Sequence, residues 1–385
     1  MNITMVIDEL DIGGAQRVVY EIARNLDNEK YRTTIICMDG KVDSLLERQM
    51  LKEQEQGKYK IVFLRKSLLS CINIPIKLLD RIVKRLLRFF LDLLILPSLF
   101  KELKKSQPDI IHVHQRGILA GFWKQSSKKP MLATIHTDPS ATFFREWEKI
   151  ISRRLVRQKR IVMVGISQFN REIIRKHWNL GDTNARYINN GINLHEFHKK
   201  PHETFTFINV SRQDKNKNQS LIVRAFARLR RENQSIPIKL ILVGNGDLHQ
   251  ALREEAKNLE TENCVEFTDG FVENANDYLA VSDVYISSSY REGLSLSALE
   301  AMASELPIIA TDAGGIRDLA RDNGILIPVN DEDALLNAMK KIMDDSELRQ
   351  RMGKISLEMV QGYSASEMAA NYADLYQELV NQQSQ

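Results

Sequence analysis

The sequence predicts an α/β fold of two Rossmann-like domains, and three observations lead to this expectation. The chain has 385 residues, which exceeds the usual size of one domain. Apolar strand-like segments alternate with amphipathic helix-like segments in both halves of the chain. Such alternation produces parallel sheets with helices packed on both faces. We therefore expect two parallel sheets, one from each half of the chain.

The first segment, 1–7, is predicted to be a buried strand, followed by a glycine pair and a helix through Leu26. Gly13 and Gly14 stand at the start of this helix, where the lack of side chains lets backbone amides approach a ligand. We interpret both as candidate substrate-binding residues, with a purely structural turn as the alternative. Because the chain opens on a strand and not on a signal peptide, we expect a cytoplasmic protein. Cys37 lies in an apolar strand and is expected in the core, and the three cysteines do not have the spacing of a known cysteine motif. Both observations fit a reducing compartment.

Residues 77–105 are interpreted as a basic amphipathic helix. The segment holds eight Lys or Arg against three acids. One predicted face carries Arg81, Arg85, Arg88 and Asp92. The opposite, apolar face carries Leu79, Val83, Leu86, Phe90 and Leu94, until Pro97 interrupts the helix. Such a helix can lie on an anionic membrane leaflet, and a core-facing helix of the first domain is the alternative. The longest uncharged run has eight residues, too few to span a bilayer.

Two further strand-like segments, 109–114 and 131–136, each end in a histidine. A single histidine at the end of a strand is more often a hydrogen-bonded structural residue than a catalyst. Carboxylate and cysteine partners at ligand spacing are missing around His114 and His136. We therefore expect no metal site there.

The clearest chemical pattern lies in residues 283–303. An apolar strand-like run is followed by Glu292 on a loop, Gly293 at a turn, and a predicted helix over 294–303 that carries Glu300. Eight residues at about 1.5 Å each place the two carboxylates roughly 12 Å apart, near the length of a nucleotide sugar. Free amides in the first helical turn suit a diphosphate. Two solvated glutamates on an exposed helix are the alternative.

This pattern closely resembles the signature of the retaining glycosyltransferases of family 4. That signature joins an acidic residue, glycine, an apolar stretch and Glu-Ala-Met-Ala to Pro-hydrophobic-hydrophobic-Ala-Thr and Gly-Gly. Residues 300–303 and 307–311 supply the two longer elements, and Gly314 and Gly315 supply the final pair. One departure is Glu305, where the family usually has glycine.

Further motifs extend the resemblance over nearly the whole chain. In segment 209–218, Arg212 and Lys217 match the spacing of an arginine and a lysine that reach the donor diphosphate, although Ser211 and Asn218 replace glycines. Three other segments are similar to family motifs: 11–17 to the Gly-Gly opening, 131–138 to the strand that delivers a histidine to the donor sugar, and 189–197 to Asn-Gly-Val-Asp-x-x-x-Phe.

The resemblance implies the two-domain GT-B fold, with the parallel sheets facing a central cleft. Residues 1–200 would form the acceptor domain, joined by a returning helix within 363–385. Residues 201–362 would form the domain that binds the nucleotide sugar.

The resemblance also implies roles for particular residues. Arg212 and Lys217 would bind the diphosphate, Glu300 the ribose hydroxyls, and Glu292 the hydroxyls of the donor sugar. The other expected contacts are His136 with the hexose, amides of Gly293, Leu294 and Ser295 with sugar and phosphate, Gly244 near the donor cleft, and Phe271 and Val272 with the base. We expect His136, Arg212, Lys217 and Glu292 to serve catalysis without a metal, because two fixed cations stabilise a leaving diphosphate.

The expected activity is retaining transfer of a hexose-type sugar from a nucleoside diphosphate sugar to an acceptor hydroxyl. A lipid-linked saccharide of bacterial surface polysaccharide synthesis is the expected acceptor, with peripheral attachment to the inner face of the membrane through 77–105. The modest net charge of +4 gives no expectation of a nucleic-acid partner. A sugar-nucleotide epimerase of the same fold and a non-catalytic polysaccharide-assembly scaffold are the alternatives.

Overall fold

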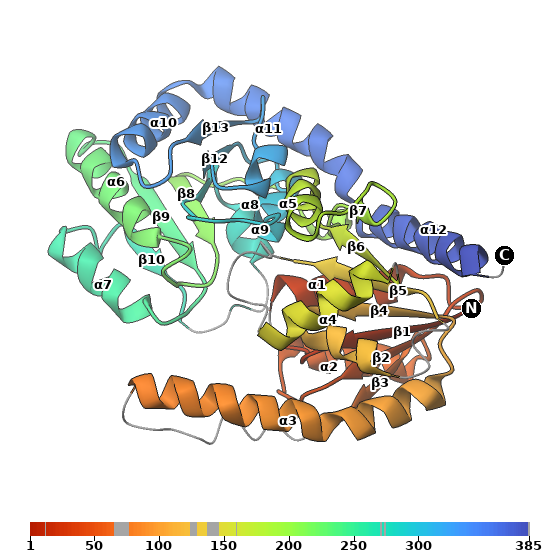
Figure 1. Ribbon diagram of the computed structural model, residues 1–385. Helices are drawn as coiled ribbons and strands as arrows, with labels where there is room; N and C mark the ends of the chain where they lie inside the picture. Colours follow the sequence, from red (N-terminus) through yellow and green to blue (C-terminus); the bar gives the residue numbers. More distant parts are fainter. Residues whose placement is uncertain are drawn as a thin grey trace. The chain divides into compact units, whose positions relative to one another are not determined.

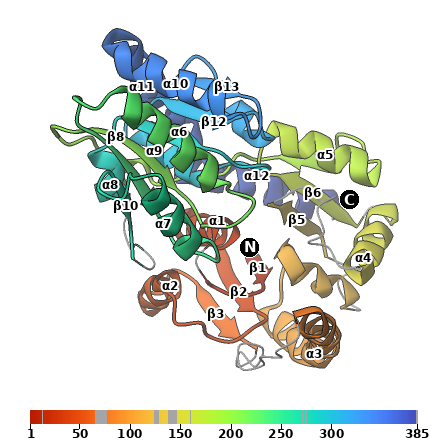
Figure 2. The same cartoon turned by 90° about the vertical axis from the view of Figure 1, so that its left-hand side faces the viewer.

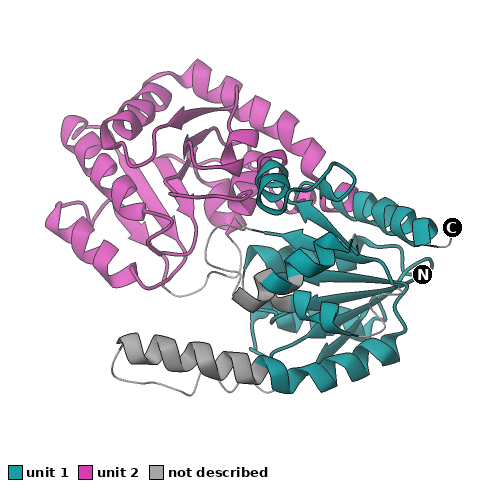
Figure 3. Ribbon diagram, viewed as in Figure 1, with its two compact units in different colours: residues 1–166, 170–189, 368–385 teal, residues 167–169, 190–367 magenta. Residues whose placement is uncertain are grey.

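The chain folds into two α/β units in the computed structural model (Figure 1). Unit 1 contains residues 1–166, 170–189 and 368–385, and unit 2 contains residues 167–169 and 190–367 (Figure 3). The structure describes all residues except 12, 65–76, 124–128, 137–145, 159, 270–271, 273–274 and 384–385. The side chains of 77–91, 116, 146–149 and 151 are likewise outside the description.

Unit 1 is built on seven parallel strands in the order β3-β2-β1-β4-β5-β6-β7. The strands are β1 (Asn2–Ile7), β2 (Arg32–Cys37), β3 (Lys60–Phe63), β4 (Ile110–His114), β5 (Met131–Ile135), β6 (Ile161–Gly165) and β7 (Ala185–Tyr187). The strand order reverses between β1 and β4, which pair directly with Ile3 opposite Ile110. Doubly wound sheets bind ligands outside the carboxyl ends of their strands at such a reversal.

Helices cover both faces of this sheet, because alternate residues of each strand point to opposite sides. Met5 of β1 belongs to one buried cluster and its neighbour Val6 to the other. The first cluster includes α1 (Gly14–Asn25), α2 (Leu45–Glu55) and α12 (Ala365–Gln383). The second includes α3 (Lys77–Ser106), η2 (Gln115–Phe122), α4 (Glu146–Arg157) and α5 (Gln168–Trp178). Figure 2 shows α1 and α12 on one side of the sheet, and α3 and α4 on the other.

Helix α3 differs from its prediction in the half whose side chains are described. The helix continues through Pro97, so the predicted interruption is wrong. Asp92, predicted on the polar face, is 2% exposed, and Leu94, predicted on the apolar face, is 72% exposed. The residues that enter the second core cluster are Ile95, Leu99 and Leu103. The assignment of faces failed because the apolar run 93–96 offers no single face by periodicity alone.

The other residues of the predicted faces of α3 have side chains outside the described part of the chain. They are Arg81, Arg85 and Arg88, and Leu79, Val83, Leu86 and Phe90. Within the described residues, no helix combines the length and the apolar character that crossing a bilayer requires. The described half of α3 thus packs as a core helix.

The last helix, α12, follows unit 2 in the sequence and packs in unit 1. Its contribution to the first core cluster consists of Met368, Tyr372, Leu375, Tyr376 and Leu379. The two chain segments that connect the units lie side by side, since Ile192 forms a parallel bridge with Ser364. A Cβ atom at Gly191 would lie 2.3 Å from the Ser364 carbonyl oxygen. Glycine is therefore required at position 191, because a side chain there would collide with the backbone at Ser364.

Unit 2 repeats the plan with six parallel strands in the order β10-β9-β8-β11-β12-β13. The strands are β8 (Phe205–Val210), β9 (Ile238–Val243), β10 (Val265–Phe267), β11 (Val284–Ser287), β12 (Ile308–Thr311) and β13 (Gly324–Ile327). Its helices are α6 (Gln219–Glu232), α7 (His249–Asn258), α8 (Asn276–Ala280), α9 (Leu296–Ala303), α10 (Glu332–Asp344) and α11 (Ser346–Val360), with short turns η4 (Leu194–Glu196), η5 (Gly315–Asp318) and η6 (Gln361–Tyr363). The order reverses between β8 and β11. The prediction of two parallel α/β sheets is confirmed.

Candidate active site

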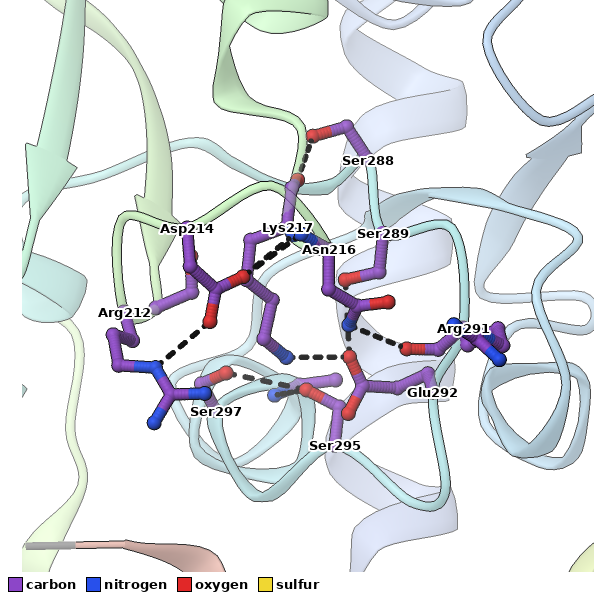
Figure 4. A network of polar contacts seen from close by, with 12 residues as sticks. Arg212, Asp214, Asn216, Lys217, Ser288, Ser289, Arg291, Glu292, Ser295 and Ser297 are labelled. Carbon is purple, nitrogen blue, oxygen red and sulfur yellow. Dashed lines mark hydrogen bonds and ion pairs between the residues drawn. The ribbon is translucent and has the colours of Figure 1, made fainter. Parts of the chain in front are cut away.

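Polar side chains gather at the carboxyl ends of β8 and β11, where the strand order of unit 2 reverses (Figure 4). Residues 211–218 follow β8, and residues 288–295 follow β11. Because β8 and β11 are paired neighbours, the two loops leave the sheet side by side. This edge is where doubly wound sheets bind ligands.

Lys217 and Glu292 form an ion pair between these two loops. The Lys217 ammonium nitrogen lies 2.6 Å from Glu292 Oε2, and the side chains are 23% and 12% exposed, respectively. The Ser289 hydroxyl donates to the same oxygen at 3.0 Å. Burial acts to lower the pKa of Lys217, but the charge of Glu292 and the hydrogen bond to it outweigh burial and hold this pKa above its usual value. The structure thus brings two predicted site residues together and keeps Lys217 positively charged.

Asp214 organises the loop that carries both predicted cations. Its Oδ1 accepts the backbone N–H groups of Asn216 at 2.9 Å and Lys217 at 3.1 Å. Its Oδ2 accepts from Arg212 Nε at 2.8 Å. Side-chain bonds of this kind to amides two and three positions ahead are what makes aspartate a turn-forming residue. Asp214 is not among the predicted site residues, although an aspartate between a strand and a helix is a recognisable signal of a turn.

Arg212 projects outward from the same loop. Its side chain is 76% exposed, and Nε is the atom bound to Asp214. Among the described residues, its two terminal nitrogens have no hydrogen-bond partner. The guanidinium is therefore fixed at one end and open at the other.

Cross-loop hydrogen bonds hold the two loops in register (Figure 4). The Ser288 hydroxyl contacts the carbonyl oxygens of Lys217 at 2.7 Å and Asn218 at 2.9 Å. Asn216 Nδ2 donates to the Arg291 carbonyl at 2.9 Å. Lys217 and Glu292 are therefore positioned by backbone contacts on both sides of the pair. Sequence patterns did not reveal these polar residues, because each bond joins segments about seventy positions apart.

Two departures from the family motif have a common conformation. Asn218 has φ 50° and Glu305 has φ 60°, both in the left-handed region. Glycine adopts this region without steric cost, and asparagine tolerates it better than most other residues. The backbone therefore keeps the shape for which glycine is the natural choice.

The Gly314-Gly315 pair lets the chain after β12 pass against the loop that carries Glu292. The Glu292 amide donates to the Ala313 carbonyl at 2.8 Å, and the Gly315 amide donates to the Glu292 carbonyl at 2.9 Å. A Cβ atom at Gly315 would lie 1.5 Å from the Gly293 carbonyl oxygen. Backbone contact on both sides thus fixes the position of Glu292.

Helix α9 begins two residues later than predicted, at Leu296, with Ser295 as its N-cap. The Ser295 hydroxyl accepts the Ala298 amide at 3.2 Å, so one first-turn donor is already satisfied. Within the described chain, the amides of Gly293, Leu294 and Ser295 have no hydrogen-bond acceptor. The free donors therefore precede the helix. Glu292 lies in a loop, so the helical rise per residue applies only from Leu296 onward, and the separation of the Glu292 and Glu300 carboxylates stays a prediction. Glu300 is half-buried in α9.

The turn after β9 packs against the loop that carries Arg212. Gly244 has φ 123°, and a Cβ atom there would lie 2.3 Å from the Ser211 carbonyl oxygen. The structure thus gives Gly244 a packing role, and its contact with substrate stays a prediction. Val272 is half-buried, whereas Phe271, the other predicted base contact, lies outside the described residues.

In unit 1, the predicted glycine pair stands at the exposed start of α1, beyond the carboxyl end of β1. Gly13 is the N-cap residue with an extended backbone. A Cβ atom at Gly13 would lie 2.5 Å from Oε1 of the buried Gln16. The missing side chain therefore lets Gln16 fold back over the helix start.

His136 follows β5 at the same edge of the unit 1 sheet, and His114 ends the neighbouring β4. Their rings are joined by a hydrogen bond of 2.9 Å between His114 Nδ1 and His136 Nε2. Burial lowers the pKa of His136 to about 4. Burial also holds the pKa of His114 well below its usual value. Both rings are therefore neutral at neutral pH. Within the described residues, no group of three or more His, Cys, Asp or Glu has the arrangement needed to hold a metal ion.

Comparison with known proteins identifies two family matches. Residues 12–196 match Glycosyltransferase Family 4, and residues 192–359 match Glycosyl transferases group 1. The putative glycosyltransferase EpsD of Bacillus subtilis is 30% identical over 185 residues, which cover 48% of this chain and 48% of EpsD. A UDP-Gal:alpha-D-GlcNAc-diphosphoundecaprenol alpha-1,3-galactosyltransferase of Escherichia coli is 26% identical over 318 residues, 75% of this chain and 80% of that protein. The match to EpsD thus spans about half of each protein.

Solved structures share the fold along the whole chain. Anabaena HepE in complex with UDP has a TM-score of 0.78 at 18% identity, covering 98% of this chain and 100% of HepE. A glycosyltransferase from Rickettsia africae has a TM-score of 0.75 at 19% identity, with 98% of both chains covered. The two family matches run together from residue 12 to residue 359. The chain therefore belongs to the glycosyltransferases of family 4, group 1, and has their GT-B fold.

Proposed function

We propose that this chain is a retaining glycosyltransferase that moves a hexose-type sugar from a nucleoside diphosphate to an acceptor hydroxyl. The observation that carries this proposal is the Lys217–Glu292 ion pair at the carboxyl edge of β8 and β11, with Arg212 open to solvent on the same loop. Fixed positive charge and a carboxylate stand together where α/β sheets bind nucleotides. In this proposal unit 2 binds the donor and unit 1 binds the acceptor.

Arg212 and Lys217 are suited to a diphosphate. Arg212 can give two parallel N–H bonds to a phosphate from the terminal nitrogens that have no described partner. Lys217 directs one N–H bond to Glu292 and keeps two donors for phosphate oxygens. Such preorganised donors stabilise the negative charge that develops on the leaving diphosphate, and each can contribute about a hundredfold to the rate.

Glu292 is suited to the sugar. Its Oε2 receives Lys217 and Ser289, whereas Oε1 has no donor among the described residues. Oε1 can therefore accept from a sugar hydroxyl. The free amides of Gly293, Leu294 and Ser295 would face the sugar and phosphate, Glu300 would accept from the ribose hydroxyls, and His136 would contact the hexose.

A front-face reaction accounts for retention with these residues. The bond between the sugar C1 and the phosphate oxygen breaks, and the acceptor oxygen bonds to C1 on the same face. The acceptor proton passes to the departing phosphate oxygen. Arg212 and Lys217 stabilise the charge on that leaving group, so the protein need not supply a nucleophile. We propose that these two cations also replace a divalent metal, and activity in the presence of EDTA tests this point.

We propose a lipid-linked saccharide of bacterial surface polysaccharide as the acceptor. The Escherichia coli relative is named for transfer to a sugar on diphosphoundecaprenol. An anionic membrane surface would bring such an acceptor to the protein. In α4, Ile150 is 64% exposed and lines an open hollow with Arg153, Arg154 and Arg157. An exposed apolar side chain beside arginines fits the interface of an anionic leaflet.

Sedimentation with vesicles tests the membrane proposal. The wild-type chain should sediment with phosphatidylglycerol vesicles and remain in solution with phosphatidylcholine vesicles. Replacing Arg81, Lys84, Arg85 and Arg88 with glutamine should release it, and the same result is expected for Arg153, Arg154 and Arg157. Sedimentation unchanged by both sets of substitutions would contradict attachment through these helices.

The activity itself is tested with a panel of UDP-, GDP- and ADP-sugars. Because HepE has been solved with UDP-glucose, UDP-sugars are the first choice. Slow hydrolysis of one donor should release the nucleoside diphosphate. NMR should show that the released sugar initially has the same anomeric configuration as the donor. A donor that changes only its sugar configuration would indicate an epimerase. A chain that binds no nucleoside diphosphate by calorimetry would instead fit a scaffold.

A further inference from the structure

Gln213 lies in the loop that follows β8 (211–218), between Arg212 and Asp214. Its side chain does not reach solvent, since the residue is 1% exposed. Its amide donates to the Asn245 carbonyl at 2.9 Å, and its carbonyl accepts the Leu248 amide at 3.1 Å. The backbone of Gln213 is therefore joined on both sides to the turn that follows β9.

The side chain of Gln213 joins the same turn and the start of α7 through both of its polar atoms. Nε2 donates to the Gly244 carbonyl oxygen at 2.9 Å, and Oε1 lies 2.7 Å from Nδ1 of His249. A carbonyl oxygen only accepts hydrogen bonds, so the contact with Gly244 fixes the orientation of the amide and leaves Oε1 facing the ring. Because Oε1 is itself an acceptor, His249 Nδ1 must carry a proton and donate to it.

The other ring nitrogen of His249 faces a donor. Arg253 Nε donates to His249 Nε2 at 3.0 Å, and a guanidinium can only donate, so Nε2 accepts and carries no proton. Arg253 is held by an ion pair with Asp269 and lies over the ring of Phe267, 5.3 Å from its centroid. Asp269 Oδ1 is 4.0 Å from His249 Nε2, beyond hydrogen-bond distance. The contacts of both nitrogens therefore agree on a neutral ring with its proton on Nδ1.

Loss of the His249 donor would disturb the loop that follows β8. Gln213 Oε1 would become an acceptor without a partner inside a buried residue, which is unfavourable unless the backbone moves. The backbone at 213 cannot move alone, because the neighbouring Asp214 binds Arg212 Nε at 2.8 Å. A displacement at Gln213 thus reaches the guanidinium of Arg212.

We propose that His249 is a positioning residue for this loop, which donates its Nδ1–H to Gln213 Oε1 and so fixes the place of Arg212. It acts through Gln213 and is not itself a ligand of the donor. The consequence for binding rests on the proposed function, in which Arg212 holds a diphosphate. The hydrogen bond from His249 to Gln213 does not depend on that function.

Nitrogen NMR of the full-length chain tests the hydrogen bond. The eight histidines would be labelled with ¹⁵N, and long-range proton–nitrogen spectra would identify the protonated nitrogen of each ring. His249→Asn assigns the His249 signals by their loss. We expect a protonated Nδ1 and an unprotonated Nε2 for His249 in the wild-type protein. A ring protonated on Nε2 would overturn the proposal.

Two substitutions at His249 test whether the donor positions the loop. His249→Leu removes the donor, so the backbone amide signals of Gln213 and Asp214 should shift. Asparagine can place its side-chain N–H near the position of Nδ1, so His249→Asn should shift them much less. Gln250→Leu is the matched control, because Gln250 is the next residue of α7, is exposed, and bonds only to Glu254 of the same helix. Equal shifts in the leucine and asparagine variants of His249 would contradict a role for the donor.

Kinetics with an active donor test the consequence for binding. His249→Leu should raise KM for the sugar nucleotide about tenfold, and His249→Asn should stay within about threefold of the wild type. The change in kcat should be smaller, because Lys217 is held independently by Glu292. In a Gln213→Leu background, adding His249→Leu should raise KM by less than about twofold, since the bond is already absent. Additive effects of the two substitutions would contradict the proposal.

The outcomes separate this inference from the proposed function. A wild-type chain with the expected His249 proton that binds neither UDP, GDP nor ADP by calorimetry would refute the proposed function and leave the hydrogen bond in place. An active wild-type chain in which His249→Leu raises KM no more than Gln250→Leu would refute the positioning role and leave the proposed function standing.

Discussion

The two units carry contrasting polar pairs at the carboxyl edges of sheets that share their strand order, except that unit 1 adds a seventh strand. In unit 2, Lys217 and Glu292 are charged, partly exposed and 2.6 Å apart. In unit 1, His114 and His136 are neutral and 2.9 Å apart, and His114 is 0% exposed. The same topology therefore supports a charged pair in one unit and a neutral pair in the other.

The difference shows that the environment decides the chemistry at each edge. Lys217 keeps its charge because a carboxylate lies within hydrogen-bond distance and outweighs burial. No carboxylate of the described residues lies within hydrogen-bond distance of the rings of His114 and His136, and burial holds their pKa values down. A charged edge can stabilise a leaving diphosphate, whereas a neutral edge can offer hydrogen bonds without attracting anions.

The largest expected effect breaks the charged pair. Lys217→Met should lower kcat/KM for sugar transfer about 10²- to 10³-fold, because the fixed positive charge beside the leaving group is lost. The free energy of unfolding should fall by about 1–3 kcal/mol, since Glu292 remains mostly buried without its partner. Steady-state kinetics and urea unfolding measure the two effects. Lys215→Met, an exposed residue of the same loop, should change neither, and equal losses in both variants would contradict a specific role for Lys217.

The second prediction removes the backbone support of Glu292. In Gly315→Ala, the new Cβ would start 1.5 Å from the Gly293 carbonyl oxygen, so the two loops must separate. We expect the free energy of unfolding to fall by about 3 kcal/mol. Gly362→Ala is the control, because a Cβ there meets nothing within 4 Å, and it should stay within about 0.5 kcal/mol of the wild type. Indistinguishable urea midpoints for the two variants would show that this close approach is unimportant.

The third prediction concerns pH and sharpens the neutral side of the comparison. An unfolded histidine binds a proton below about pH 6.5. Folded His136 binds one only near its pKa of about 4. Between about pH 6.5 and 4 the unfolded state therefore binds more protons than the folded state, so the free energy of unfolding of unit 1 falls as the pH is lowered through this window. The loss attributable to His136 should approach about 1.4 kcal/mol per pH unit within it.

Tryptophan fluorescence can follow this loss in unit 1 alone. The three tryptophans, Trp123, Trp147 and Trp178, all belong to that unit. His136→Asn should make stability fall less steeply as the pH is lowered from 6.5 to 4, while His112 and His114, whose pKa values burial also lowers, keep their part of the dependence. His198→Asn replaces an exposed histidine and should leave the dependence unchanged. A wild-type stability that rises as the solution is acidified would refute the neutral assignment.

The smallest expected effect concerns the loop that supports the cations. Asp214→Asn keeps one acceptor for the amides of Asn216 and Lys217 but loses the charge that holds Arg212. We expect KM for the donor to rise about fivefold, corresponding to about 1 kcal/mol, with a smaller change in kcat. Substrate titrations of initial rates measure the change. Asp322→Asn, an exposed residue of unit 2, serves as the reference, and a similar rise there would remove the reason to single out Asp214.

Local patterns predicted the fold well because each strand and helix carries its own periodicity. Strands β8 and β11 follow from segments that are each continuous in sequence. The family resemblance implied that Lys217 and Glu292 bind one donor, and the structure places them 2.6 Å apart. The start of α9 was predicted two residues early, although Ser295 is a good N-cap residue. In the described half of α3, Asp92 and Leu94 were assigned to the wrong faces, because the apolar run 93–96 offers no single face by periodicity alone.

The histidine network in unit 1 could not be predicted in the same way. His112 and Tyr376 are 264 positions apart, and no periodicity within either segment indicates that their polar atoms meet. The environment that keeps His114 neutral is likewise a result of tertiary packing. Sequence therefore indicated which histidines end strands, while their protonation depends on the assembled core.

The position of α12 has a consequence for the order in which the protein is made. Its tyrosines at 372 and 376 belong to the core that β1 and α1 begin, more than three hundred residues earlier. On the ribosome, the core of the first sheet therefore stays incomplete until α12 (365–383) has been synthesised. Unit 2, by contrast, consists of residues 167–169 and 190–367, so all of its segments have been synthesised before α12 is complete. Unit 2 should therefore complete its folding before unit 1, although domains usually fold in order from the amino terminus during synthesis.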